Sequence, residues 1–118
     1  YETARAFRNG FGTAKDVTQA ARYYELAAQA GHADAQCSLG AFYYRGLGVE
    51  KSPEKAVEWF KKAALQGDRA AQFNLGGCYL EGTGVTQDQM KAIKWYRASA
   101  NNGYRRATRA LKELGITP

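Results

Sequence analysis

Apolar side chains recur along the chain at four-residue steps, in short runs that end at glycine. In the middle of the chain Ala35, Leu39 and Tyr43 follow this spacing, and Gly46 comes directly after them. Residues three or four apart share one face of an α-helix, and glycine suits the left-handed position that ends a helix. The pattern therefore predicts a helix over about 34–45.

A second amphipathic run begins at Ser52 and Pro53. A serine side chain can accept a hydrogen bond from the first turn of a helix, and proline fits the first helical position. Gly67 ends the run. The run predicts a helix over about 53–66, paired with the first. Its apolar stripe consists of Ala56, Trp59, Phe60, Ala63 and Ala64.

The predicted helix pair occurs again 36 residues later, as the interval from Gly46 to Gly82 shows. A weaker copy precedes it, and it carries Phe7, Gly10, Gly12, Ala20, Tyr23, Ala28 and Gly31. Repetition at such a period is typical of stacked helical repeats. The positions that match between the two full copies are Ala35/Ala71, Gln36/Gln72, Leu39/Leu75, Gly40/Gly76, Tyr43/Tyr79, Gly46/Gly82, Gly48/Gly84, Val49/Val85, Ala56/Ala92, Trp59/Trp95, Ala64/Ala100 and Gly67/Gly103.

The repeat predicts an all-α fold for residues 1–118, taken as one domain. We expect repeats over about 1–32, 33–68 and 69–104, and a capping helix over about 105–115 with a polar outer face. Asp88 should cap a helix in the third copy, and Asp16 with Gln19 resembles a capping box in the first. Small residues such as Gly40 and Gly76 should let helices approach, with Trp59 and Trp95 filling the core beside them.

The Gly-x-Gly-Val stretches at Gly46 and Gly82 raise the alternative of a phosphate-binding loop. A dinucleotide fingerprint needs a preceding strand and a third glycine at the start of the following helix. Both stretches lie between two predicted helices and lack that third glycine. We therefore interpret them as turns, with Val49 and Val85 inserted into the core of each pair.

Reactive side chains do not converge in the sequence. His32 is the single histidine, and Cys37 and Cys78 form neither a CxxC motif nor a set at metal-ligand spacing. Glu54 and Glu58 are four residues apart beside lysines, which favours surface ion pairs over acid–base chemistry. We expect no enzymatic activity, no cofactor and no metal. No apolar stretch is long enough to cross a bilayer.

The formal charge of +6 is unevenly distributed. Residues 1–68 carry nine basic and eight acidic side chains, whereas residues 69–118 carry eight basic and only three acidic ones. Such an excess can attract an acidic partner or nucleic acid. Alternatively, these lysine and arginine side chains simply solvate the helix surfaces and bind no partner.

The pattern A-x-A-Q-x-x-L-G-x-x-Y-x-x-G-x-G-V, followed by K-A-x-x-W-x-x-x-A-x-x-x-G, resembles the Sel1-like repeat (SLR) family, a branch of the tetratricopeptide superfamily. The resemblance implies a right-handed superhelix of helix hairpins that binds other proteins as a scaffold or adaptor. A cysteine-rich branch carries a disulfide in each repeat. Cys37 and Cys78 occupy non-equivalent repeat positions, so the chain departs from that branch.

In this geometry the first helix of each repeat lines the concave face, which we expect to bind a peptide or protein, such as an acidic peptide. Single-stranded RNA bound by the basic C-terminal part is the alternative, although Asp34, Glu81 and Glu113 interrupt the basic surface. We expect a monomer or a weak end-to-end dimer. The predicted partner-binding residues are Arg5, Arg8, Tyr44, Arg45, Phe73, Leu80, Arg106 and Arg109, with Asp34, Ala41, Gly77 and Glu81 on the same face.

Overall fold

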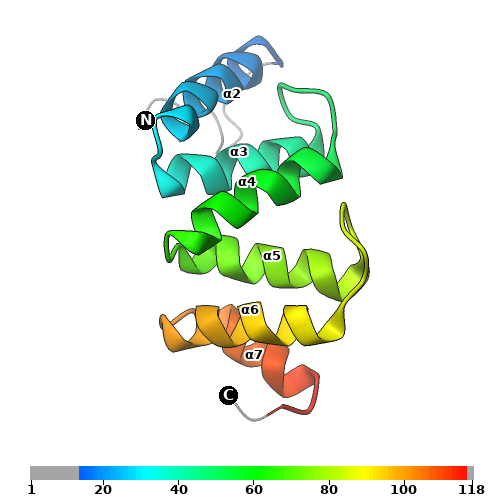
Figure 1. Cartoon of the computed structure of the whole chain (residues 1–118). Helices are drawn as coiled ribbons and strands as arrows, with labels where there is room; N and C mark the ends of the chain where they lie inside the picture. The colour runs from blue at the N-terminus through cyan, green and yellow to red at the C-terminus, as the bar shows by residue number, and fades with distance from the viewer. Residues whose placement is uncertain (1–13, 117–118) are drawn as a thin grey trace.

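The computed structural model describes residues 14–116, which form six helices and no strand. The described helices are α2 (Ala14–Gln29), α3 (Ala33–Arg45), α4 (Pro53–Leu65), α5 (Arg69–Glu81), α6 (Gln89–Asn101) and α7 (Arg105–Glu113). They are layered in chain order, and each packs against the helices before and after it (Figure 1). The first helix of the first repeat, predicted before Ala14, lies outside the described residues.

The predicted helix boundaries are confirmed to within one residue for the second repeat, which consists of α3 and α4. The side chain of Ser52 accepts a hydrogen bond from the backbone N–H of Lys55, and Asp88 accepts one from Lys91 in the third repeat, α5 and α6. The capping box expected at Asp16 is wrong, because α2 already begins at Ala14. The handedness of the superhelix stays a prediction.

Short turns and long loops alternate along the stack, and they lie at opposite edges (Figure 1). Each short turn closes with a glycine at positive φ. At Gly67, for example, the backbone N–H of Asp68 donates to the carbonyl of Ala63, and the N–H of Gly67 donates to that of Ala64. This is the Schellman arrangement, which satisfies the last carbonyls of a helix.

The long loops contain the Gly-x-Gly stretches, and their second glycine contacts the preceding repeat. A Cβ atom on Gly48 would lie 2.5 Å from the carbonyl oxygen of Val17, and one on Gly84 would lie 2.6 Å from the carbonyl carbon of Pro53. Both glycines also have positive φ, at 69° and 72°. The stretches are therefore turns, as predicted, and their second glycine lets each loop pack on the backbone at the start of the previous hairpin's second helix.

Glycines in α3 and α5 allow close crossing within each hairpin, but the aromatic residues beside them are not the predicted tryptophans. A Cβ on Gly40 would lie 2.7 Å from the ring of Phe60, and one on Gly76 would lie 2.8 Å from the ring of Tyr96. Phe60 and Tyr96 are buried, whereas the tryptophans one position earlier are only partly buried at the edge of the core. On a helix, adjacent residues point about 100° apart, and here the second of each pair faces the glycine.

Buried amide side chains connect successive hairpins. Gln72 Nε2 donates to the carbonyl of Ala64 at 3.2 Å, and Gln72 Oε1 accepts from Asn102 Nδ2 at 3.1 Å. Gln36 repeats the arrangement, donating to Ala28 at 3.1 Å and accepting from Gln66 at 2.8 Å. Each glutamine thus joins the end of the previous hairpin to the end of its own.

Replacing Gly84 with alanine should destabilise the protein far more than replacing Gly67. Both residues have positive φ, so each substitution carries the left-handed backbone penalty of about 1 kcal/mol. Nothing lies within 4 Å of a Cβ on Gly67, whereas one on Gly84 collides with the backbone of Pro53. We expect G84A to lose about 2 kcal/mol more than G67A in urea unfolding. Equal losses would contradict the proposed contact between loop and hairpin.

Replacing Gln72 with alanine should lower the free energy of unfolding by about 1 kcal/mol, because the carbonyl of Ala64 loses one of its two donors and keeps only the backbone N–H of Gly67. The matched control is Gln89→Ala at the exposed first residue of α6, which should change stability by less than about 0.5 kcal/mol. Urea unfolding followed by circular dichroism measures both. A Q72A variant as stable as Q89A would show that the buried amide does not hold the stack together.

Candidate functional site

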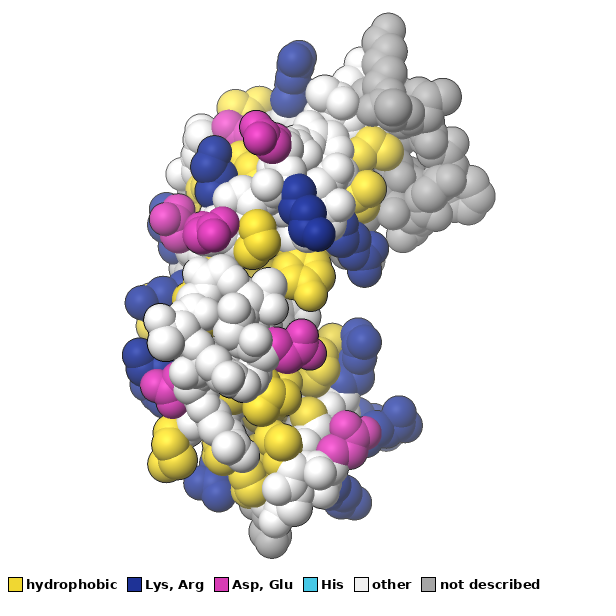
Figure 2. All heavy atoms as spheres, turned by 90° about the vertical axis from the view of Figure 1, so that its right-hand side faces the viewer, with side chains coloured by type: hydrophobic (Ala, Val, Ile, Leu, Met, Phe, Trp, Pro, Cys, Tyr) yellow, Lys and Arg dark blue, Asp and Glu magenta, His cyan; other side chains and the backbone are white. Residues whose placement is uncertain are grey.

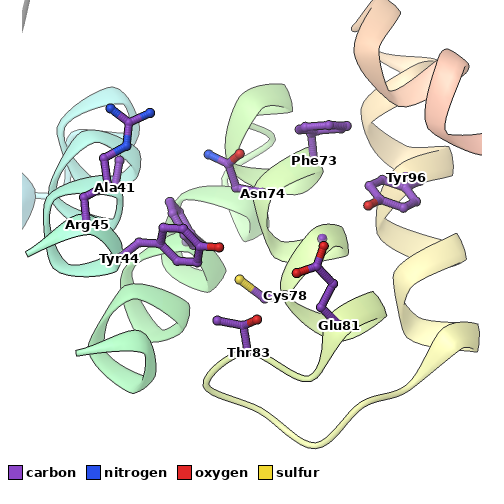
Figure 3. A pocket seen from close by; sticks show the side chains of 11 residues that line it. Ala41, Tyr44, Arg45, Phe73, Asn74, Cys78, Glu81, Thr83 and Tyr96 are labelled. Carbon is purple, nitrogen blue, oxygen red and sulfur yellow. The ribbon is translucent and has the colours of Figure 1, made fainter. Parts of the chain in front are cut away.

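A pocket of about 330 Å³ lies between α3 and α5, the first helices of the second and third repeats. Helix α4 and helix α6 each contribute one aromatic ring, and the loop after α5 contributes one residue (Figure 3). The full lining is Ala41, Tyr44, Arg45, Phe60, Phe73, Asn74, Gly77, Cys78, Glu81, Thr83 and Tyr96.

Three of the predicted binding residues meet in this pocket, which is called the groove below. Tyr44 and Arg45 come from the last turn of α3, and Phe73 comes from the second turn of α5. Tyr44 is 42% exposed although its side chain is aromatic. Ala41, Gly77 and Glu81, expected on the same face, also line the groove.

The other predicted residues lie elsewhere. Leu80 is partly buried and packs against the core formed by α4 to α7. Arg106 is exposed on α7, and its guanidinium carbon lies 5.4 Å from the centre of the Phe73 ring, while Arg109 is exposed and does not line the groove. Asp34 lines a second pocket at the turn between α2 and α3. Arg5 and Arg8 are outside the described residues.

Sequence reasoning missed the floor of the groove. Phe60 and Tyr96 reach it from the second helices of their hairpins, and Cys78 reaches it from α5. These three residues are 3%, 4% and 4% exposed respectively. Their apolar character predicts burial, but nothing local in the sequence shows that buried residues of α4 and α6 also line a space between α3 and α5.

An aromatic cluster extends the groove toward α7. The ring of Phe73 lies 5.5 Å from that of Tyr96 and 5.4 Å from that of Tyr104, measured between centroids. Both pairs are tilted, and Arg106 lies over the Phe73 ring at cation–π distance. The wall that carries Phe73 is therefore held in place from two sides.

The polar groups of the groove are of mixed charge. Arg45 and Glu81 are exposed at its edge. Burial, with Glu81 nearby, raises the pKa of the Cys78 thiol to about 11, and burial likewise raises the pKa of Tyr96. Both groups are therefore neutral at physiological pH.

Seen from the edge that carries the long loops, the molecule is bent and hollowed on one side (Figure 2). Lys or Arg side chains border the hollow above and below, with acidic side chains among them. Within residues 14–116 no group of three His, Cys, Asp or Glu side chains is arranged to hold a metal ion. None of the described helices is long and apolar enough to span a membrane.

The thiol of Cys78 should alkylate slowly at neutral pH. In a Cys37→Ser variant, which leaves Cys78 as the only cysteine, the iodoacetamide rate should rise about tenfold per pH unit, because thiolate is the reactive form. Mass spectrometry over time measures the rate. A rate that levels off near about pH 9 would contradict the raised pKa, since it would indicate an ordinary thiol.

The chain is similar to known repeat proteins over most of its length. The family model described as Sel1 repeat matches residues 1–32, 33–68 and 69–104. A comparison with curated proteins finds no match.

Three solved structures show the same fold. A protective antigen of uropathogenic Escherichia coli strains with an SLR fold is 36% identical, with a TM-score of 0.87, over 94% of this chain and 24% of that one. A Sel1 repeat protein from Oxalobacter formigenes is 40% identical, with a TM-score of 0.80, over 86% of this chain and 40% of that one. Helicobacter pylori cysteine rich protein B is 26% identical, with a TM-score of 0.75, over 79% of this chain and 70% of that one.

The chain thus spans less than half the length of the first two of these structures. Sel1 repeats form scaffolds that generally mediate protein interactions. The three matched repeats, together with the layered helix hairpins, show that this chain belongs to the Sel1 repeat family.

Proposed function

We propose that the chain is a non-catalytic scaffold that captures a peptide segment of a partner protein in the groove between α3 and α5. The observation that supports this function best is the arrangement of Tyr44 and Phe73 on opposite walls of one pocket. Exposed Tyr and Arg side chains beside a buried apolar floor are typical of the centre of a protein interface.

The size of the groove favours a peptide over a globular surface. A volume of about 330 Å³ accommodates one or two side chains, and its floor of Phe60, Cys78 and Tyr96 is apolar. Backbone of the partner would then continue along α3 and α5 toward α7. Because so few side chains are enclosed, we expect weak, micromolar-type binding rather than an obligate complex.

Charge favours an acidic partner. The protein carries a formal charge of +6, Arg45 is exposed at the edge of the groove, and Arg106 is exposed over the Phe73 ring. Arginine pairs well with carboxylates because its planar guanidinium offers two parallel donors. Glu81 is the one acidic side chain in the lining, so acidic residues of the partner should flank the groove rather than enter it.

The double variant Tyr44→Ala with Phe73→Ala should abolish peptide capture. A random peptide library displayed on phage, selected against the immobilised protein, supplies peptides whose dissociation constants are measured by fluorescence polarisation. We expect the double variant to weaken binding about tenfold or more, because both walls lose their aromatic rings. Helicity measured by circular dichroism should be unchanged.

The matched control is Leu65→Ala with Met90→Ala, which removes two apolar side chains that are 70% and 76% exposed outside the groove. It should bind as the unaltered protein does. If removal of Phe73 unfolds the chain, Tyr44→Ala alone carries the test, since that ring is largely exposed. If the folded variant still binds the selected peptides with unchanged affinity, the binding site lies outside the groove.

A titration with single-stranded RNA at rising salt tests the competing possibility. Binding through phosphates falls steeply with ionic strength, whereas binding anchored by Tyr44 and Phe73 should fall mildly. RNA binding with a steep salt dependence that Tyr44→Ala leaves unchanged would count against the peptide scaffold.

A further inference from the structure

Three pairs of equivalent positions in successive repeats line the groove, and the residue differs between the repeats at each of them. One pair, Arg45 and Glu81, is exposed at the edge of the groove. Gly77 stands where the second repeat has Ala41, and Tyr96 stands where it has Phe60. All four residues line the same groove. Since the second repeat folds with Ala41 and Phe60, neither Gly77 nor the hydroxyl of Tyr96 is required by the hairpin architecture.

Gly77 is not explained by packing. Glycine inside a helix is less stable than alanine, because it has more backbone freedom to lose. A Cβ atom on Gly77 would meet only the hydroxyl oxygen of Tyr96, at an ordinary contact distance of 3.6 Å. The neighbouring Gly76 differs, since its Cβ would lie 2.8 Å from the ring of Tyr96. The fold needs Gly76, and it has room for a methyl group at position 77.

The hydroxyl of Tyr96 is not explained by the fold either. The residue is only 4% exposed, yet its hydroxyl points into the groove (Figure 3). No hydrogen bond joins it to the other described residues, and it is not one of the buried unpaired polar atoms, so it reaches water in the groove. A hydroxyl that reaches water in a pocket and makes no hydrogen bond within the fold can donate to a ligand without breaking a protein hydrogen bond. Burial raises the pKa of Tyr96, so the hydroxyl stays a proton donor.

These two features are adjacent and complementary. Gly77 leaves open the space directly beside the hydroxyl oxygen of Tyr96, and a methyl group there would cover it. Phe60, Cys78 and the ring of Phe73 make the remaining surroundings apolar. A group that fits must therefore combine an apolar body with one hydrogen-bond acceptor.

We propose that Gly77 and Tyr96 form an anchor socket, in which one large apolar residue of the partner peptide inserts beside Gly77 while its main-chain carbonyl accepts a hydrogen bond from Tyr96 Oη. This inference rests on the proposed peptide-binding function. The acceptor is a neutral carbonyl rather than a carboxylate, because Glu81 lines the same groove and would repel a second negative charge. The socket therefore selects an apolar residue within a chain, with acidic residues placed outside it.

The test converts the socket of the third repeat to the residues of the second. N-acetyl-L-tryptophanamide, which has an indole ring and neutral carbonyls, is titrated while the backbone amide signals are followed by NMR. We expect millimolar or tighter binding that shifts the signals of Asn74, Gly77 and Cys78. Tyr96→Phe and Gly77→Ala should each weaken binding by about three- to tenfold.

Thermal stability distinguishes a binding role of Gly77 and Tyr96 from a structural one. Tyr96→Phe should leave the melting temperature unchanged, because Phe60 already occupies the equivalent position, and Gly77→Ala should raise it by a few degrees. The matched control is Tyr79→Phe, which removes a hydroxyl from a buried tyrosine outside the groove and should not alter binding. N-acetyl-L-tryptophan, with a free carboxylate, should bind more weakly than the amide.

Each outcome decides between the two proposals. If the library-selected peptides lose affinity in Tyr44→Ala with Phe73→Ala but not in Tyr96→Phe or Gly77→Ala, the groove stands and the socket is wrong. Absence of tryptophanamide-induced shifts at Gly77 also overturns the socket. If none of these variants changes peptide affinity, the groove itself is not the binding site.

Discussion

The stacking of this protein depends on a side-chain amide buried between hairpins. The last carbonyls of a helix lack partners within that helix. The backbone N–H groups of Gly31 and Gly67 supply one donor each to the carbonyls of Ala28 and Ala64, which leaves a second lone pair to be satisfied inside the stack. Gln36 and Gln72 donate to such carbonyls of the preceding hairpin and accept from Gln66 or Asn102 at the end of their own. A single glutamine therefore links the helix end of one hairpin to the helix end of the next. This link fixes both the register and the distance between neighbouring hairpins.

Close crossing within each hairpin then determines where a groove can form. Because Gly40 and Gly76 have no side chains, the rings of Phe60 and Tyr96 lie directly against the first helices. From there the same rings extend into the space between α3 and α5. The floor of the groove is thus a consequence of the packing within each hairpin. A larger residue at either glycine would displace the ring that packs on it, and with that ring the floor of the groove.

Local signals made most of the fold predictable, while the site was predictable only in part. Ser52, Asp88 and Gly46 act within a turn or two of their own positions, so the sequence places helix ends correctly. Tyr44 and Phe73 line one groove because the repeat period places two first helices on either side of it. Phe60 and Tyr96, rather than the adjacent tryptophans, pack on the glycines because of how each second helix is rotated about its axis. Apolar periodicity does not determine that rotation to within one residue. Leu80 faces the core for the same reason.

Repeats also separate the residues that fold the chain from those that give it a site. Positions shared by both full copies, such as Leu39/Leu75 and Gly48/Gly84, are buried or contact backbone of the neighbouring hairpin. Groove-lining positions at which the two copies differ are not fixed by packing. One copy shows that the hairpin also folds with the other residue at that position. Selection for packing alone would favour alanine over glycine at position 77. The departure from the repeat is therefore more informative about binding than the repeat itself, and it requires the structure to show which departures share one space.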